Sequence, residues 1–121
     1  KNIGKKIILI DRFVDSTIAY QHYGMGIDIE LINNINKFLL KNIKINFTFL
    51  NLVSQKNMSL RLSKRRNLNR YDKFKYSFYK KIQNGFIKIQ KKTPNKYMKI
   101  NSDLNVSINK KLIISKVEEL I

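Results

Sequence analysis

The chain has 121 residues, 43% of them hydrophobic, so residues 1–121 are expected to form one domain with a single modest core. It has no cysteine and one histidine, which excludes a disulfide framework, a thiolate metal site and a histidine-rich metal site. Its apolar runs are far shorter than the roughly 20 residues that cross a bilayer, and together with the lack of cysteine this predicts a soluble, cytoplasmic protein without a membrane partner.

The formal net charge of +17 suggests nucleic-acid binding, because clustered Lys and Arg residues supply the phosphate contacts of such proteins. Here the basic residues are mostly lysines scattered along the chain. Lys, Asn and Ile all have AT-rich codons, so genomic drift towards A and T would raise them without functional selection. The aromatic residues also fall at helical core spacing rather than among the basic ones. We therefore expect no specific nucleic-acid partner. A basic nucleic-acid-binding module is the least favoured of three hypotheses for this chain.

The first predicted element is a strand at Ile7–Ile10, a continuous apolar run that suits a strand buried on both faces of a parallel sheet. A short helix follows, which we expect Asp15 or Ser16 to cap and Gly24 to end. A second helix is predicted over residues 28–41. Its apolar residues are spaced to form one buried stripe, which consists of Ile32, Ile35, Phe38 and Leu39.

The next strand is predicted at Ile45–Val53, where aromatic and branched residues dominate. Ser54 is expected to cap a helix that runs into the basic segment 61–72. After the basic segment, a long amphipathic helix is predicted from apolar residues at intervals of three and four, which are Phe74, Phe78, Ile82, Phe86 and Ile89. A strand at Lys96–Asn101 and a closing helix at Ile108–Leu120 complete the chain. Strands that alternate with helices indicate a parallel α/β fold.

Two groups of polar side chains suggest chemistry on phosphates. Asp11 and Arg12 follow the first predicted strand, and ligands of open parallel sheets collect outside the carboxyl ends of strands. An Asp at such a position is typical of acids that help hold Mg²⁺ in phosphate-transfer enzymes, and a guanidinium group binds phosphate oxygens in pairs. Many buried strands end in Asp only because the chain turns there, so that alternative stays open. The second group is a basic run that a solvated helix face would also explain, and its arginines are Arg61, Arg65, Arg66 and Arg70.

Residues 11–28, DRFVDSTIAYQHYGMGID, match the pattern D-R-[YFH]-x-x-S-[ST]-x-A-Y-Q-x-x-G-x-G-x-D. On these residues the chain resembles the thymidylate kinases. The similarity continues through the predicted strand at 45–53, the basic segment and the long helix, and becomes loose after Pro94. The resemblance implies a P-loop nucleoside-monophosphate-kinase fold, a three-layer arrangement around a parallel sheet, of which this chain holds only the later strands and helices.

The resemblance also implies an activity: transfer of the γ-phosphoryl group of ATP to dTMP with Mg²⁺, giving dTDP, in a homodimer that we expect to form through helix 28–41. Asp11 would lie near the sugar and the Mg²⁺–phosphate cluster, and Arg12 would bridge the phosphates of donor and acceptor. Tyr20 would pack beside the deoxyribose. The other residues implied at dTMP are Ser16, Thr17, Gln21 and Asp72. A lid over about 61–72 would bring arginines to ATP, which are Arg61, Arg65, Arg66 and Arg70, with Arg65 also acting in catalysis.

The chain departs from the family pattern in ways that predict a partial protein. It contains no G-x-x-x-x-G-K-[ST] loop, so we expect the cradle for the ATP phosphates to be encoded upstream. Asp72 stands where the family has Glu, and three positions carry Asn where it has Asp: Asn46, Asn51 and Asn69. In the family a further strand lies between those that correspond to Ile7–Ile10 and Phe47–Val53, so this segment alone is not expected to reach the family's structure. A catalytically inactive, truncated nucleotide-kinase remnant is therefore the alternative to an active enzyme.

Overall fold

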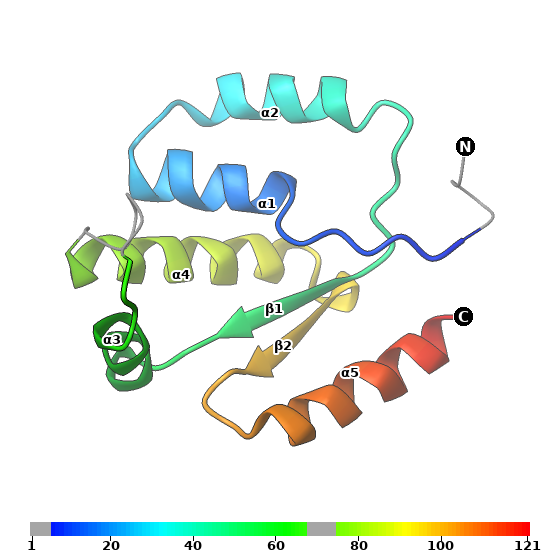
Figure 1. Cartoon of the computed structure of the whole chain (residues 1–121). Coiled ribbons are helices and arrows are strands. Elements are labelled where there is room, and N and C mark those ends of the chain that lie inside the picture. The colour runs from blue at the N-terminus through cyan, green and yellow to red at the C-terminus, as the bar shows by residue number, and fades with distance from the viewer. Residues whose placement is uncertain (1–5, 68–74) are drawn as a thin grey trace.

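The computed structural model describes residues 6–67 and 75–121, and Figure 1 shows how their helices and strands are arranged. Within these residues no helix is long and apolar enough to cross a membrane. The strands and helices predicted from the second helix onward are present. In chain order the elements are α1 (Val14–Thr17), the π-helix η1 (Ile18–Gly24), α2 (Ile29–Leu39), β1 (Thr48–Leu52), α3 (Gln55–Ser63), α4 (Tyr76–Lys92), the 3-10 helix η3 (Pro94–Lys96), β2 (Tyr97–Asn101) and α5 (Val106–Leu120).

The sheet of the described residues consists of β1 and β2, which run parallel in a register that aligns Thr48 with Tyr97 and Leu52 with Asn101. Parallel neighbours require a long crossover connection, and α3 and α4 lie within it. In Figure 1, α4 covers one face of the sheet, α1 and α2 lie beyond α4 on the same side, and α5 lies on the opposite side. The predicted α/β class, with helical layers around a parallel sheet, is confirmed.

The main core lies between α4 and the first helical segment. Ala19 of η1 is buried there against Ile82 and Ile89 of α4. The two helices approach closely because α4 has a glycine at the contact: a side-chain carbon built on Gly85 would lie 2.6 Å from the ring of Tyr23. The apolar spacing therefore predicted correctly which face of α4 is buried, although its first expected member, Phe74, lies outside the described residues.

The apolar run Ile7–Ile10 is not a strand, contrary to the prediction. It has no regular secondary structure, and all four side chains are exposed, with Leu9 at 84%. A strand buried on both faces needs neighbours that satisfy its backbone and cover its side chains. Within the described residues the hydrogen-bonded sheet contains β1 and β2 only, so the fold offers this run no such neighbours.

The first helix does not begin as predicted. Phe13 is its N-cap residue and makes no side-chain capping bond, while Asp15 and Ser16, the expected caps, lie inside the helix. The prediction was wrong, and the carboxylate of Asp15 instead accepts a hydrogen bond from Tyr97, 82 positions along the chain. The helical segment ends at Gly24 as predicted, but it reaches that residue as a π-helix.

Helices α2 and α3 are both capped by side chains. The carboxylate of Asp28 accepts from the backbone N of Glu30 at 2.7 Å, and Ser54 caps α3 as predicted by accepting from Asn57. The predicted stripe of α2 is only partly buried. Ile32 is in the core, whereas the other members are exposed, namely Ile35, Phe38 and Leu39. In Figure 1, α2 is the outermost helix of its layer, so only one edge of its stripe meets the rest of the molecule.

Candidate functional site

Arg12 and Tyr20, two residues that the sequence places in the site, contact each other. The guanidinium carbon of Arg12 lies 4.5 Å from the centroid of the Tyr20 ring, a cation–π contact. The backbone of Arg12 has a φ of 64°, in the left-handed region that non-glycine residues seldom adopt. Such strained residues cluster at functional sites, where the surrounding structure fixes them. The exposed carboxylate of Asp11 precedes Arg12 at the same turn.

The other candidate dTMP residues lie on α1 and η1. Ser16 and Tyr20 are four positions apart, as are Thr17 and Gln21, so each pair lies on one side of the helical segment. Thr17 is exposed and the other three are half-buried. The backbone N of Met25 donates to the carbonyl of Tyr20 at 3.0 Å, five residues back, which is the bond of a π-helix. Turns of this kind are frequent at functional sites.

Asp15 attaches this segment to the sheet. Its Oδ2 accepts a hydrogen bond from the phenol of Tyr97 at 2.7 Å. Burial is the main cause that raises the pKa of Tyr97 above its ordinary value, and the hydrogen bond and charge of Asp15 raise it further. Sequence reasoning missed this pair, because the two residues lie far apart in the chain and neither has a distinctive local pattern.

The arginine group begins in the last turn of α3. There Arg61 donates a hydrogen bond from Nη2 to the carbonyl oxygen of Ser102, in the connection between β2 and α5. Arg65 and Arg66 follow α3 and are exposed. Arg70 and Asp72 lie outside the described residues. The lid over residues 61–72 therefore stays a prediction.

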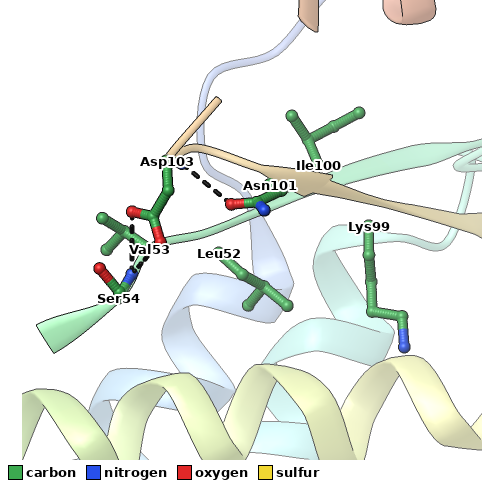
Figure 2. Close-up of a pocket in the computed structure, with 7 residues that line it drawn as sticks. All are labelled: Leu52, Val53, Ser54, Lys99, Ile100, Asn101 and Asp103. Atoms are coloured by element: carbon green, nitrogen blue, oxygen red, sulfur yellow. Dashed lines mark hydrogen bonds between the residues drawn. The ribbon is translucent and has the colours of Figure 1, made fainter. Parts of the chain in front are cut away.

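A pocket of about 260 Å³ lies at the carboxyl ends of both strands, close to the start of α3. This is the edge where open α/β sheets collect ligands. Figure 2 shows the side chains of Leu52 and Lys99 on one side of the sheet, Ile100 on the other, and the carboxylate of Asp103 directed at Ser54. The full lining is Leu52, Val53, Ser54, Lys99, Ile100, Asn101 and Asp103.

Asp103 is a residue of this pocket that the sequence did not reveal. The side-chain hydrogen bond from Asn57 is the largest cause that lowers the pKa of its carboxyl group, followed by the bond from the backbone of Ser54. The charge of Arg61 acts in the same direction. Asn57 and Ser54 lie 46 and 49 positions from Asp103 in the chain, so no local pattern could have shown these hydrogen bonds.

The described residues suit an Mg²⁺ site only if oxygens of the substrate phosphates and of water supply most of the ligands. Among residues 6–67 and 75–121 no three His, Cys, Asp or Glu side chains are grouped so that they could hold a metal ion. Mg²⁺ in phosphate-transfer sites is usually bound by one or two carboxylates, with phosphate and water oxygens as the remaining ligands. The exposed carboxylate of Asp11 suits such a site, whereas an all-protein cage would not fit the described residues.

Comparison with known proteins shows which family the chain belongs to. The profile described as "Thymidylate kinase" matches residues 1–113. The chain belongs to the thymidylate kinase family. It is 34% identical over 118 residues to the thymidylate kinase of Wolbachia sp. subsp. Brugia malayi, with 92% of this chain and 56% of that protein covered. It is 42% identical over 106 residues to the thymidylate kinase of Ehrlichia ruminantium, with 87% of this chain and 50% of that protein covered.

A solved structure supports the same assignment. The crystal structure of the thymidylate kinase from Ehrlichia chaffeensis resembles this chain with a TM-score of 0.65 at 29% sequence identity, covering 96% of this chain and 53% of that one. The family and its P-loop nucleoside-monophosphate-kinase fold, inferred above from residues 11–28, are confirmed. The chain spans about half the length of the relatives it matches.

Proposed function

We propose that this chain supplies the dTMP pocket and the lid of an enzyme that transfers the γ-phosphoryl group of ATP to dTMP in the cytoplasm. The product, dTDP, would serve dTTP biosynthesis. The observation that carries the proposal is the contact between Arg12 and Tyr20, because it unites two residues of the family motif in one place. The strained backbone of Arg12 further suggests a side chain that is held in position for a ligand.

Phosphoryl transfer requires positioning and neutralisation of charge more than covalent chemistry from the protein. A phosphate oxygen of dTMP forms the new bond to the γ-phosphorus, the bond from that phosphorus to the bridging oxygen of ATP breaks, and its electron pair leaves with ADP. Arg12 would bind oxygens of both nucleotides and hold the attacking oxygen in line. When bound to the phosphates, Mg²⁺ supplies further neutralisation of their charge, with Asp11 as the nearby carboxylate.

The pocket for the nucleoside would be formed by α1 and η1. Tyr20 would pack beside the deoxyribose, while Ser16, Thr17 and Gln21 offer hydroxyl and amide groups for hydrogen bonds to thymine. Arg61, Arg65 and Arg66 would reach ATP when the lid closes, which excludes water that could take the phosphoryl group.

The ATP phosphate cradle would come from outside these 121 residues, since the chain contains no P-loop motif. A homodimer through α2 is part of the same proposal. It is supported by the exposed apolar side chains of that helix, where Phe38 is 79% exposed and three neighbours are at least half exposed: Leu31, Ile35 and Leu39.

The experiment that tests the proposal measures dTDP formation from dTMP, ATP and Mg²⁺. It compares the 121-residue chain with the extended protein, by which we mean this chain joined to the residues that its gene encodes upstream to the nearest in-frame start codon. We expect activity in the extended protein alone. Activity in neither would favour an inactive remnant, and full activity of the 121-residue chain would contradict the assignment of the phosphate cradle to other residues.

A matched pair of variants assigns any activity to this site. Arg12→Ala in the extended protein should lower kcat/KM by roughly a hundredfold or more, as the loss of a transition-state charge partner typically does. Lys111→Ala removes a positive charge from the exposed surface of α5 and should leave the activity unchanged. Equal losses in the two variants would contradict a specific role for Arg12.

A further inference from the structure

We infer that Asp103 is a positioning residue for Arg61: it fixes the start of α3 and, through this helix, Arg61 in its last turn. The inference rests on the proposed function, because the role of Arg61 at ATP is part of that proposal. Within the described residues, the carboxylate of Asp103 accepts its hydrogen bonds from α3 and its N-cap residue and not from the residues assigned to dTMP. Its effect on catalysis would therefore be indirect.

The side chain of Asp103 holds the first turn of α3 from a distant part of the chain. Both of its carboxylate oxygens lie 3.1 Å from the backbone N of Ser54, the N-cap residue of the helix. Oδ1 also accepts a hydrogen bond at 2.9 Å from Nδ2 of Asn57, in the first turn. Hydrogen bonds to an ionised carboxylate are stronger than those between neutral groups. One side chain thus fixes two successive parts of the helix start.

The loop that carries Asp103 is itself attached to the sheet and to the other end of α3. The backbone N of Ser102 donates to the carbonyl of Leu52 at 2.8 Å, and the backbone N of Asp103 donates to Oδ1 of Asn101 at 3.0 Å. At the far end of α3, Arg61 donates to the carbonyl oxygen of Ser102. Helix α3 is therefore joined to this one loop at both its first and its last turn.

Helix α3 relies strongly on these polar contacts, because none of its nine residues is fully buried and only Asn57, Met58 and Leu62 are half-buried. Helix α4, by contrast, buries Ile82 and Ile89 and is held by its core face. A helix without buried side chains opens and shifts at low cost unless bonds at its ends restrain it. Removing the carboxylate of Asp103 should consequently loosen α3 and Arg61 while leaving the core intact.

Hydrogen exchange in the extended protein tests the structural part. In Asp103→Ala we expect amide exchange of residues 54–63 to rise roughly tenfold, as for loss of a hydrogen bond to a charged group, with unchanged exchange in α4. Asp103→Asn keeps an acceptor without the charge, and its exchange in residues 54–63 should lie between that of the wild type and that of Asp103→Ala. Unchanged exchange in residues 54–63 would overturn the inference, since Asp103 would then have no effect on α3. An equal rise throughout α4 would also overturn it, since Asp103 would then affect only the stability of the whole protein.

Asn105→Ala is the matched control. Asn105 lies two residues from Asp103, is also exposed, and caps α5 by accepting from the backbone N of Ser107 at 2.9 Å. Its loss should raise exchange in the first turn of α5 and not in α3. A double-mutant cycle of Asp103→Ala with Asn57→Ala should be non-additive, because the two side chains share one hydrogen bond. Additive effects, or the same rise in α3 with Asn105→Ala, would overturn the proposed link.

Kinetics of the extended protein test the functional part. Asp103→Ala should lower kcat/KM for ATP by roughly tenfold or more, since a displacement of about 1 Å far from the chemistry can cost up to about a hundredfold, and should leave KM for dTMP unchanged. If the wild-type protein is inactive, the proposed function fails while hydrogen exchange still decides whether Asp103 holds α3. If the wild-type protein is active and the variant matches it, the positioning role is wrong and the function stands.

Discussion

Tyr97, the first residue of β2, donates a hydrogen bond to Asp15 of α1, and the two oxygens lie 2.7 Å apart. This contact joins the sheet to the short helix that carries Ser16 and Thr17. Both partners are partly shielded from water, so the bond competes less with solvent than the exposed bonds at the helix caps. The position of the candidate dTMP residues relative to the sheet therefore depends on a pair in which neither member belongs to the candidate site.

Tyr97→Phe should destabilise the protein by about 1–2 kcal/mol, because it leaves the half-buried carboxylate of Asp15 without its donor. Denaturant unfolding, followed by circular dichroism, measures the change. Tyr76→Phe is the control, since within the described part of the chain the hydroxyl of Tyr76 has no hydrogen-bond partner and its loss should be nearly neutral. Equal effects of the two substitutions would contradict a specific role for the bond.

The same pair predicts a pH dependence on the alkaline side. Burial and Asp15 raise the pKa of Tyr97 above the ordinary tyrosine value of about 10. The stability that Tyr97 contributes is therefore fully present below about pH 10 and is lost as the pH rises through the higher pKa of the folded state. Ultraviolet titration near pH 10 should show that the wild type gains more tyrosinate absorbance on unfolding in denaturant than Tyr97→Phe does, because Tyr97 ionises there only when the protein is unfolded. An equal gain in the two proteins would show that Tyr97 is not responsible.

Gly85 is required by the close approach of α4 to Tyr23. A methyl group at this position would lie within 2.6–2.8 Å of three atoms of the Tyr23 side chain, so Gly85→Ala should destabilise the protein by about 1–3 kcal/mol despite the better helix propensity of Ala. Asn84→Ala, one residue earlier and exposed, should be neutral or slightly stabilising. Thermal unfolding compares the two. In a Tyr23→Ala background the cost of Gly85→Ala should largely disappear, and a full cost there would show that the ring is not the obstacle.

The exposed stripe of α2 predicts an association of two copies. Phe38→Glu places a charge in the middle of the apolar side chains and should shift a dimer of the extended protein towards monomer, as measured by light scattering after gel filtration. Asn33→Glu adds the same charge at an exposed position of α2 outside the apolar stripe and should leave the mass unchanged. A monomeric wild type, or a dimer that survives Phe38→Glu, would contradict the proposed interface.

Local patterns in the sequence predicted the elements that are determined by a nearby capping residue or by an apolar spacing repeated along one helix. The spacing of Ile82 and Ile89 predicted the buried face of α4, and Ser54 predicted the start of α3. The run Ile7–Ile10 has the composition of a buried strand, but its state depends on neighbours in a sheet, and those are not encoded in the run itself. The same limit applies to α2, where the pattern shows an apolar stripe but not which part of it another element covers.

The sequence could predict those residues of the candidate site that belong to one contiguous motif. Arg12 and Tyr20 belong to the pattern at residues 11–28, and the structure brings them into contact. Asp15 and Asp103 were missed as structural partners because their hydrogen bonds reach residues 46 to 82 positions away. Such bonds are decided by the topology of the sheet, so they become visible only once β1 and β2 are paired.

The contact between Arg12 and Tyr20 leads to the last prediction, which concerns how the ring contributes to binding. If the face of Tyr20 holds the guanidinium group ready for phosphate, Tyr20→Leu in the extended protein should weaken dTMP binding about fivefold, the equivalent of a cation–π contact of about 1 kcal/mol. Tyr20→Phe keeps the ring and should retain most of the affinity. Binding of thymidine, which has no phosphate, should change less than binding of dTMP when both are measured by calorimetry. In an Arg12→Ala background the extra loss for dTMP should vanish, because the ring then has no guanidinium group to hold. An equal loss for thymidine and dTMP would instead assign Tyr20 to the sugar alone.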